Sequence, residues 1–241
     1  MAEQALRSIA VPRQIPVVLS FVAGYVDSCT YLGLFGVFVA QVTGSFVLGG
    51  AELVRSEPGA LARLLAIPFF FVAGVAITIL VHSMRDRPRS AFAWCLVVEC
   101  ILLIGFITSC LTSMPFRGPD TPSAIVALMF GMTAMSTQSA MVRLLMRGMP
   151  STNVMTTNTT MLAISAGEIL VGCLARHNGG PALNADYAQA RTEFVTLLSI
   201  ALGFLAGTAV GAIAYITVGL LCVLLAILPI GSLAVWYMRH L

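Results

Sequence analysis

The chain has 241 residues, of which 59% are hydrophobic and only 10% are charged, with 13 basic and 10 acidic side chains. A water-soluble domain carries charge on about a quarter of its residues, so this composition excludes an ordinary soluble enzyme and a disordered chain. The net charge of +3 is scattered without a basic run, which excludes a nucleic-acid partner. The composition predicts an all-α, polytopic helix bundle in the lipid bilayer.

Apolar stretches in chain order indicate where the chain crosses the bilayer, since one span needs about 20 apolar residues. Six stretches qualify: 15–35, 64–83, 91–113, 122–146, 194–214 and 216–238. Charged or proline-containing turns and a polar insert at 176–191 separate them. We expect residues 1–14 to form a cytoplasmic N-terminal segment and residues 15–241 to form a single transmembrane domain.

Two further segments, 36–54 and 151–172, are long enough to cross but are unusually polar. They are either full spans or re-entrant or broken segments. Cytoplasmic loops carry the excess of arginine, and the sequence has no lysine. Eight full crossings would put eight arginines inside and five outside, whereas two re-entrant segments put ten inside and three outside. The charges therefore favour six spans plus two re-entrant or broken segments, with both termini in the cytoplasm.

The order of these elements suggests an internal repeat. The sequence Phe-Val-Ala-Gly-Val-Ala at 71–76 recurs as Phe-Leu-Ala-Gly-Thr-Ala at 204–209, each time downstream of a polar segment. Each half, about 15–113 and 122–238, would be a span, a re-entrant segment and two spans, so the second half would be inverted. Such repeats are common in secondary transporters, where interrupted helices build the site near the midplane. Chance recurrence of small apolar residues is the alternative.

One motif is more specific. Gly24-Tyr25-Val26-Asp27 and the stretch at 36–45, Gly-Val-Phe-Val-Ala-Gln-Val-Thr-Gly-Ser, resemble the YoaK-like family of bacterial integral membrane proteins. This family is a domain of unknown function with about six spans, and the similarity covers roughly 15–238. Family members usually have Asn at the positions of Gln41 and Ser45, and Gln-Asn-Ala where this chain has Gln-Ser-Ala at 138–140. The resemblance implies the span count and a place in the bacterial cytoplasmic (inner) membrane, but no activity.

Acids inside apolar stretches are the first candidates for function. A charge in hydrocarbon costs several kcal/mol and needs a partner or a polar cavity, so Asp27, Glu99 and Glu168 could exchange protons or could be structural. Gln138 occupies the position of Asp27 in the other half, and the polar segments supply hydroxyls and amides. The substrate- or ion-binding candidates are Asp27, Gln41, Thr43, Ser45, Glu99, Gln138, Asn153, Thr156, Asn158 and Glu168.

A second candidate feature is the glycine stripe of Gly203, Gly207 and Gly211, whose spacing lets two helices approach closely. It predicts either packing within one subunit or a homodimer seam. Histidines and cysteines lack metal-ligand spacing, so we expect no metal, no cofactor and no enzymatic activity.

These features favour a small secondary transporter or permease for a small polar solute or an ion, with coupling to protons through the acids. The alternative is a non-catalytic integral-membrane partner or assembly subunit.

Overall fold

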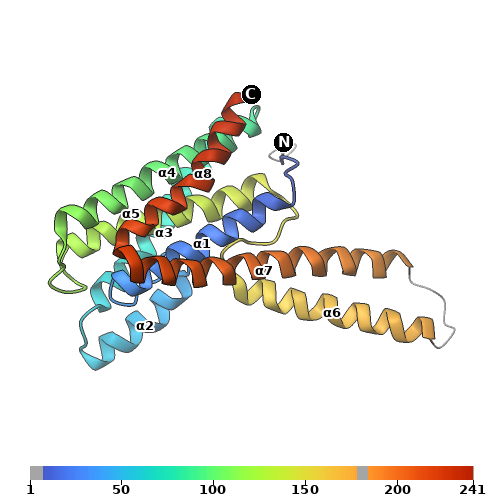
Figure 1. Cartoon of the computed structure of the whole chain (residues 1–241), viewed down its shortest axis with the longest axis horizontal. Helices are drawn as coiled ribbons and strands as arrows, with labels where there is room; N and C mark the ends of the chain where they lie inside the picture. Colours follow the sequence, from blue (N-terminus) through green and yellow to red (C-terminus); the bar gives the residue numbers. More distant parts are fainter. Residues whose placement is uncertain (1–7, 178–183, 241) are drawn as a thin grey trace, which may run out of the picture.

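The computed structural model describes residues 8–177 and 184–240. Within them every regular element is a helix, which confirms the all-α prediction (Figure 1). The elements are α1 (Gln14–Gly33), α2 (Val42–Arg55), α3 (Ala60–Ser83), α4 (Pro88–Ser113), α5 (Pro122–Leu145), α6 (Met155–His177), α7 (Asn184–Val218), the 3-10 helix η1 (Gly219–Cys222) and α8 (Val223–Arg239).

Local sequence explains several helix boundaries. Pro88 and Pro122 begin α4 and α5, and proline is favoured there because the first helical N–H has no intrahelical partner. Gly59 precedes α3 with a φ of 112°, and Gly219 begins η1 with a φ of 63°. Glycine adopts such positive φ values at little cost. Gly219 therefore allows α7 to end and the chain to turn into α8.

Six described stretches are long and apolar enough to cross a membrane, the last of which contains both α7 and α8. The number matches the predicted six, but the set differs. Met155–Leu174 of α6, predicted as part of a re-entrant or broken segment, is among the six, whereas α7 and α8, predicted as two spans, fall in one stretch. The two polar segments differ, however. The first is non-helical over 34–41 and continues as α2, whose 14 residues reach about 21 Å and fall short of a bilayer core of about 30 Å. The second polar segment begins at the end of a non-helical stretch, 146–154. It then continues as α6, an unbroken helix of 23 residues.

The helices pack in a regular pattern. Helix α1 packs against α7, and α5 packs against α3, while α4 contacts both α5 and α8. Helix α2 packs on α3, and α6 packs on α7. Figure 1 shows α6 and the first part of α7 extending away from the other helices.

The glycine stripe of α7 faces α1. A Cβ atom added at Gly203, Gly207 or Gly211 would collide with backbone carbonyl oxygens of α1, those of Val17, Phe21 and Tyr25 respectively. The stripe therefore brings together two helices of the same chain, the first of its two predicted roles.

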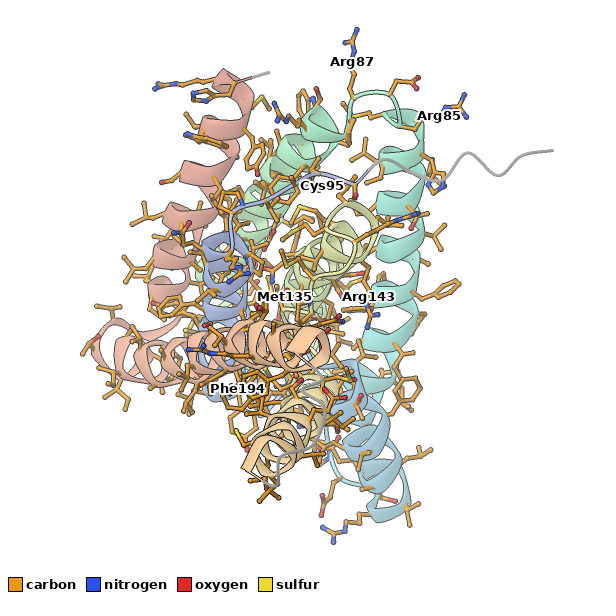
Figure 2. All side chains as sticks on the ribbon, turned by 90° about the vertical axis from the view of Figure 1, so that its right-hand side faces the viewer. Arg85, Arg87, Cys95, Met135, Arg143 and Phe194 are labelled. Atoms are coloured by element: carbon orange, nitrogen blue, oxygen red, sulfur yellow. The ribbon has the colours of Figure 1, made fainter. Side chains whose placement is uncertain are left out.

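Several arginines gather at one end of the molecule. Ser8, Arg87 and His240 line one cavity of about 590 Å³ at this end, and the N–H of Ile9 donates to the carbonyl of Leu145 at 2.9 Å. The start of the described chain, the α3–α4 turn, the end of α5 and the end of α8 thus lie together. Figure 2 shows Arg85 and Arg87 projecting from the same end.

Candidate functional site

Asp27 on α1 holds the first non-helical segment, 34–41. Its Oδ1 accepts hydrogen bonds from the backbone N–H groups of Val39 (2.8 Å) and Ala40 (2.7 Å). The side-chain amide of Gln41 lies beside the same carboxyl. Asp27 is 2% exposed, and its Oδ2 has no hydrogen-bond partner among the described residues. One carboxyl oxygen therefore holds the backbone of the segment, and the other is buried without such a role.

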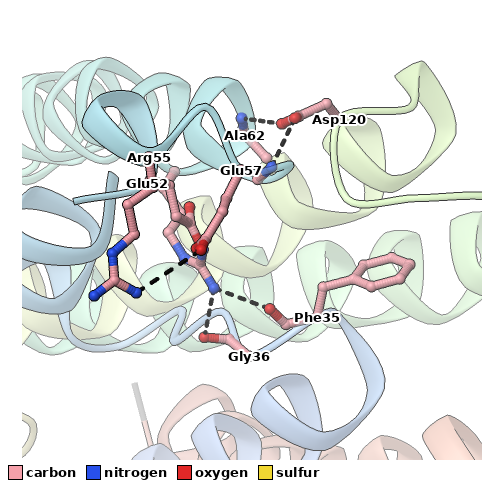
Figure 3. A network of polar contacts seen from close by, with 9 residues as sticks. Phe35, Gly36, Glu52, Arg55, Glu57, Ala62 and Asp120 are labelled. Atoms are coloured by element: carbon pink, nitrogen blue, oxygen red, sulfur yellow. Dashed lines mark hydrogen bonds and ion pairs between the residues drawn. The ribbon is translucent and has the colours of Figure 1, made fainter. Parts of the chain in front are cut away.

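Arg63 on α3 clamps the start of this segment (Figure 3). Phe35 and Gly36 have left-handed φ values of 53° and 73°, and their carbonyl oxygens accept hydrogen bonds from Nη2 of Arg63 at 2.9 and 3.3 Å. Nη1 of Arg63 pairs with Glu52 of α2, and the Arg63 side chain is 7% exposed. The pair lets a guanidinium be buried beside the bent backbone, since a buried charge needs a partner.

Asp120, in the loop between α4 and α5, fixes the start of α3. Its two carboxyl oxygens accept hydrogen bonds from the N–H groups of Gly59 (2.7 Å) and Ala62 (2.9 Å), as Figure 3 shows. A carboxylate satisfies the free N–H groups of a helix start and interacts favourably with the helix dipole. Asp120 thereby positions the helix that carries Arg63.

The second non-helical segment, 146–154, is held by Gln138 on α5. The Gln138 side chain is fully buried, and its Nε2 donates to Thr152 Oγ1 and to the carbonyl of Leu19 on α1, both at 3.0 Å. Asn158 near the start of α6 donates to the carbonyl of Ser151 at 2.6 Å. Oε1 of Gln138 has no partner among the described residues. No hydrogen bond joins Gln138 to Asp27; each side chain holds its own segment.

Asn153 joins the two segments. Its Nδ2 donates to the carbonyl of Ala40 at 3.4 Å. Its Oδ1 accepts hydrogen bonds from the hydroxyls of Ser151 (3.1 Å) and Ser139 (3.4 Å). We call the group formed by Asp27, Ala40, Gln138 and Asn153 the loop junction.

A cavity of about 480 Å³ lies beside the second non-helical segment, 146–154. Ser151 and Asn158 line it, together with Arg13 and Arg143 from the arginine-rich end of the molecule. Because Ser151 also donates to Asn153, the cavity lies one hydrogen bond away from the junction.

The other predicted residues do not join this hydrogen-bond network. Glu99 on α4 is fully buried, and both of its carboxyl oxygens lack a hydrogen-bond partner in the described part of the chain. Ser45 is buried on α2 with an unpaired hydroxyl, whereas Thr43 and Thr156 are exposed. Glu168 is exposed and lines a separate cavity between α6 and α7.

The chemistry of the loop junction is that of hydrogen bonding. It offers one carboxyl oxygen and one amide oxygen without partners, among fixed amides and hydroxyls. Over residues 8–177 and 184–240, no group of three or more His, Cys, Asp or Glu could hold a metal ion. A buried acceptor without a hydrogen bond lowers the stability of the fold. A polar molecule that donates hydrogen bonds would satisfy these two acceptors.

Sequence reasoning missed several supporting residues. Arg63 and Asp120 were not among the candidates, because their partners lie in other elements and no local spacing marks them. Thr152 and Ser139 each stand next to a predicted residue, and this adjacency was the available signal.

The fold and the apolar helices define a multi-pass membrane protein built as a helix bundle. The chain belongs to the DUF1275 family, described as proteins of unknown function, whose family model matches residues 15–236. This confirms the family resemblance inferred from the motif around Asp27. Comparisons with curated proteins and with solved structures give no match.

Proposed function

We propose that this protein is a small secondary transporter or permease that moves a small polar solute or ion across the bacterial cytoplasmic membrane. The observation that carries the proposal is the hydrogen bond between Asn153 and Ala40, which joins two non-helical segments, one from each half of the chain. Non-helical backbone at membrane depth is tolerated only where protein buries it or where it lines a wet cavity. Secondary transporters build their substrate sites from such segments.

An inverted repeat of α1–α4 and α5–α8 is supported by the packing. In such a repeat α1 corresponds to α5, α2 to α6 and α3 to α7. The α1–α7 contact then corresponds to the α5–α3 contact, and the α2–α3 contact corresponds to the α6–α7 contact. Helices α1 and α5 run in opposite directions. The chain before α1 meets the end of α5 through Ile9 and Leu145, while the end of α1 and the start of α5 both lie beside the start of α3.

The orientation follows from the arginines. Arg85, Arg87 and Arg89 lie in or beside the turn between α3 and α4, at the end that gathers Ser8 and His240. Arg55, Arg63 and Arg117 belong to the opposite end, near the α2–α3 turn and the α4–α5 loop. The excess of positive charge faces the cytoplasm in membrane proteins, so both termini are assigned to the cytoplasmic side.

The loop junction favours a substrate with N–H or O–H donors, or a cation. Oδ2 of Asp27 and Oε1 of Gln138 are the acceptors that such a substrate would satisfy. Among residues 8–177 and 184–240, the carboxyl oxygens of Glu99 have no hydrogen-bond partner. An acid of this kind inside the membrane is suited to carrying a proton. The proposal assigns substrate contact to Asp27, Gln138 and Asn153, and proton coupling to Glu99.

The test is reconstitution into liposomes that contain a pH-sensitive dye, with a panel of amines, amides, polyols and inorganic cations added outside. A preceding thermal-shift screen identifies solutes that bind, because a ligand at 100 times its Kd stabilises the folded state by about 2.7 kcal/mol. We expect one solute class to change the internal pH with the wild type and not with Glu99→Gln. Asn153→Ala should lose the thermal shift as well.

The matched control is Thr160→Val on α6, since this exposed hydroxyl bonds only the backbone of its own helix, at Thr156. It should behave as the wild type. If no solute binds or moves with folded protein, or if Asn153→Ala keeps full binding, the proposed site is wrong.

One observation favours the alternative of an assembly subunit. Glu168 is exposed on α6, the helix that extends away from the others in Figure 1, and an exposed acid on an apolar helix is suited to a partner. A partner that co-purifies with the wild type and is lost with Glu168→Gln, while Asn153→Ala retains it, would support that function instead.

A further inference from the structure

Two cysteines from opposite halves of the chain are in contact. Cys29 lies on α1 and Cys222 ends η1, 193 residues later, and their Sγ atoms are 3.2 Å apart. Two carbon atoms pack best at about 3.5–4.0 Å, and sulfur is a larger atom than carbon. The two sulfur atoms are therefore closer than in an ordinary packing contact. A disulfide needs about 2.05 Å, so the two sulfurs would have to approach by roughly 1 Å. Both side chains are buried, at 0% and 1% exposure.

The surroundings hold this pair in place. The hydroxyl of Tyr25, one turn before Cys29 on α1, donates to the carbonyl of Cys222 at 2.8 Å. The thiol of Cys29 also lies 3.5 Å from the carbonyl of Gly211, at the glycine stripe where α7 meets α1. The contact between the two sulfurs is thus part of the tight packing of α1 against α7 and η1.

The other cysteines provide a contrast. Cys95, Cys100 and Cys110 lie on α4 and Cys173 lies on α6. None of these four contacts another thiol in the described part of the chain, where all six cysteines are free. The pairing geometry is therefore specific to Cys29 and Cys222.

We propose that Cys29 and Cys222 are a redox-active dithiol that converts to a disulfide, tying α1 of the first half to the α7–α8 junction of the second. The reaction is thiol–disulfide exchange with a disulfide oxidant. One thiolate attacks the oxidant and releases one thiol; the second thiolate then attacks the mixed disulfide and releases the other. The protein loses two electrons and two protons, and the oxidant's S–S bond is reduced to two thiols.

The location suits this chemistry. Cys29 is one turn from the end of α1, and that end adjoins Arg63 through Phe35 and Gly36. Under the orientation in the proposed function, this is the non-cytoplasmic end, facing the compartment in which disulfides persist. Because both sulfurs are buried, exchange must await an opening of the contact between α1 and η1, so oxidation reports on that opening.

The test uses the full chain in detergent micelles. A variant that keeps only Cys29 and Cys222 is incubated with oxidised glutathione, unfolded, and labelled with a maleimide polymer that retards the protein once per free thiol. We expect two labels before oxidation, none after oxidation, and two again after dithiothreitol, always at the mass of a single chain. The oxidised form should also unfold at a higher temperature than the reduced form.

The matched control keeps Cys29 and Cys110, which are both buried but lie in helices without such a contact. It should retain two labels or acquire glutathione.

In case the multiple replacement impairs folding, the wild-type protein is oxidised and digested, and the peptide containing Cys29 should be found linked to the one containing Cys222. Two free labels after oxidation of folded protein, or linkage of Cys29 to another cysteine, would overturn the proposal. The experiment needs no substrate, so its outcome is independent of the proposed transport.

Discussion

The side-chain amide of Asn153 donates a hydrogen bond to the backbone carbonyl of Ala40, 113 residues earlier in the chain. Each partner belongs to a non-helical segment that precedes a helix, α6 and α2 respectively. Each segment is also held by a buried polar side chain on the helix before it, Gln138 and Asp27. The loop junction is thus a contact between two similarly built segments, and its stability depends on both.

Replacement of Asp27 should destabilise the fold through the backbone it satisfies. In Asp27→Ala the N–H groups of Val39 and Ala40 lose their acceptor, and each unsatisfied buried group costs about 1–3 kcal/mol. Asp27→Asn keeps an acceptor oxygen and should lose much less. Thermal unfolding, followed by the fluorescence of the two tryptophans, measures the difference. Equal losses in the two variants would show that the carboxyl does not hold this segment.

Removal of Arg63 should be more damaging than its place near a turn suggests. In Arg63→Leu, Glu52 is left without its ion pair, and breaking a buried pair costs about 3–5 kcal/mol. Adding Glu52→Gln should restore part of the loss, because no unpaired charge remains. The control is Arg55→Ala, which breaks the exposed pair with Glu57 at 3.8 Å, worth at most about 1 kcal/mol. If the double variant is as unstable as the sum of its single variants, the ion pair is not the cause.

A methyl group on the glycine stripe should push α7 away from α1. In Gly207→Ala the added Cβ would collide with the carbonyl oxygen of Phe21, and overpacking of this kind costs about 1–3 kcal/mol. Gly167→Ala on α6 meets open space and should instead stabilise by up to about 1 kcal/mol through helix propensity. Unfolding temperatures in one detergent compare the two variants. Opposite signs are expected, and a neutral Gly207→Ala would contradict the tight α1–α7 contact.

Glu99 should limit stability while serving function. Its carboxyl is buried and has no hydrogen bond within the described part of the chain. A buried polar group in that state costs about 1–3 kcal/mol in proteins. Glu99→Met should therefore raise the unfolding temperature and abolish the solute-dependent pH change in liposomes. Glu99→Gln keeps a polar group of similar size, so it should lose the pH change without the gain in stability. A clear fall in stability for Glu99→Met would indicate a structural role for the carboxyl.

Most of the spanning helices could be read from the sequence because hydrocarbon imposes a length and a polarity on each helix. Helix α6 was the exception, since its hydroxyls and amides made a helix of spanning length look like a re-entrant or broken segment. The same constraint made Asp27 and Asn153 conspicuous, as an acid in an apolar stretch and as part of a polar run. Both lie in the loop junction. Local composition was therefore sufficient to find the centre of the candidate site.

Composition could not say which polar residues would be buried. Thr43 and Thr156 come from the same polar segments as Ser45 and Asn153, yet the first two are exposed and the last two are buried. Likewise, Arg63 donates to the carbonyls of Phe35 and Gly36, which lie 28 and 27 positions earlier. The sequence around Arg63 does not indicate these partners. Residues that act across elements become visible only when the elements are placed together.

Helix α7 has a mechanical consequence. It is one continuous helix of 35 residues. Near its start it packs on α6, around Tyr187 and Ala190, and farther along it meets α1 through Gly207 and Gly211. A continuous helix transmits tilt along its length. A displacement of α6 and the first part of α7 would therefore tilt the rest of α7 about its glycine contact with α1, the helix that carries Asp27.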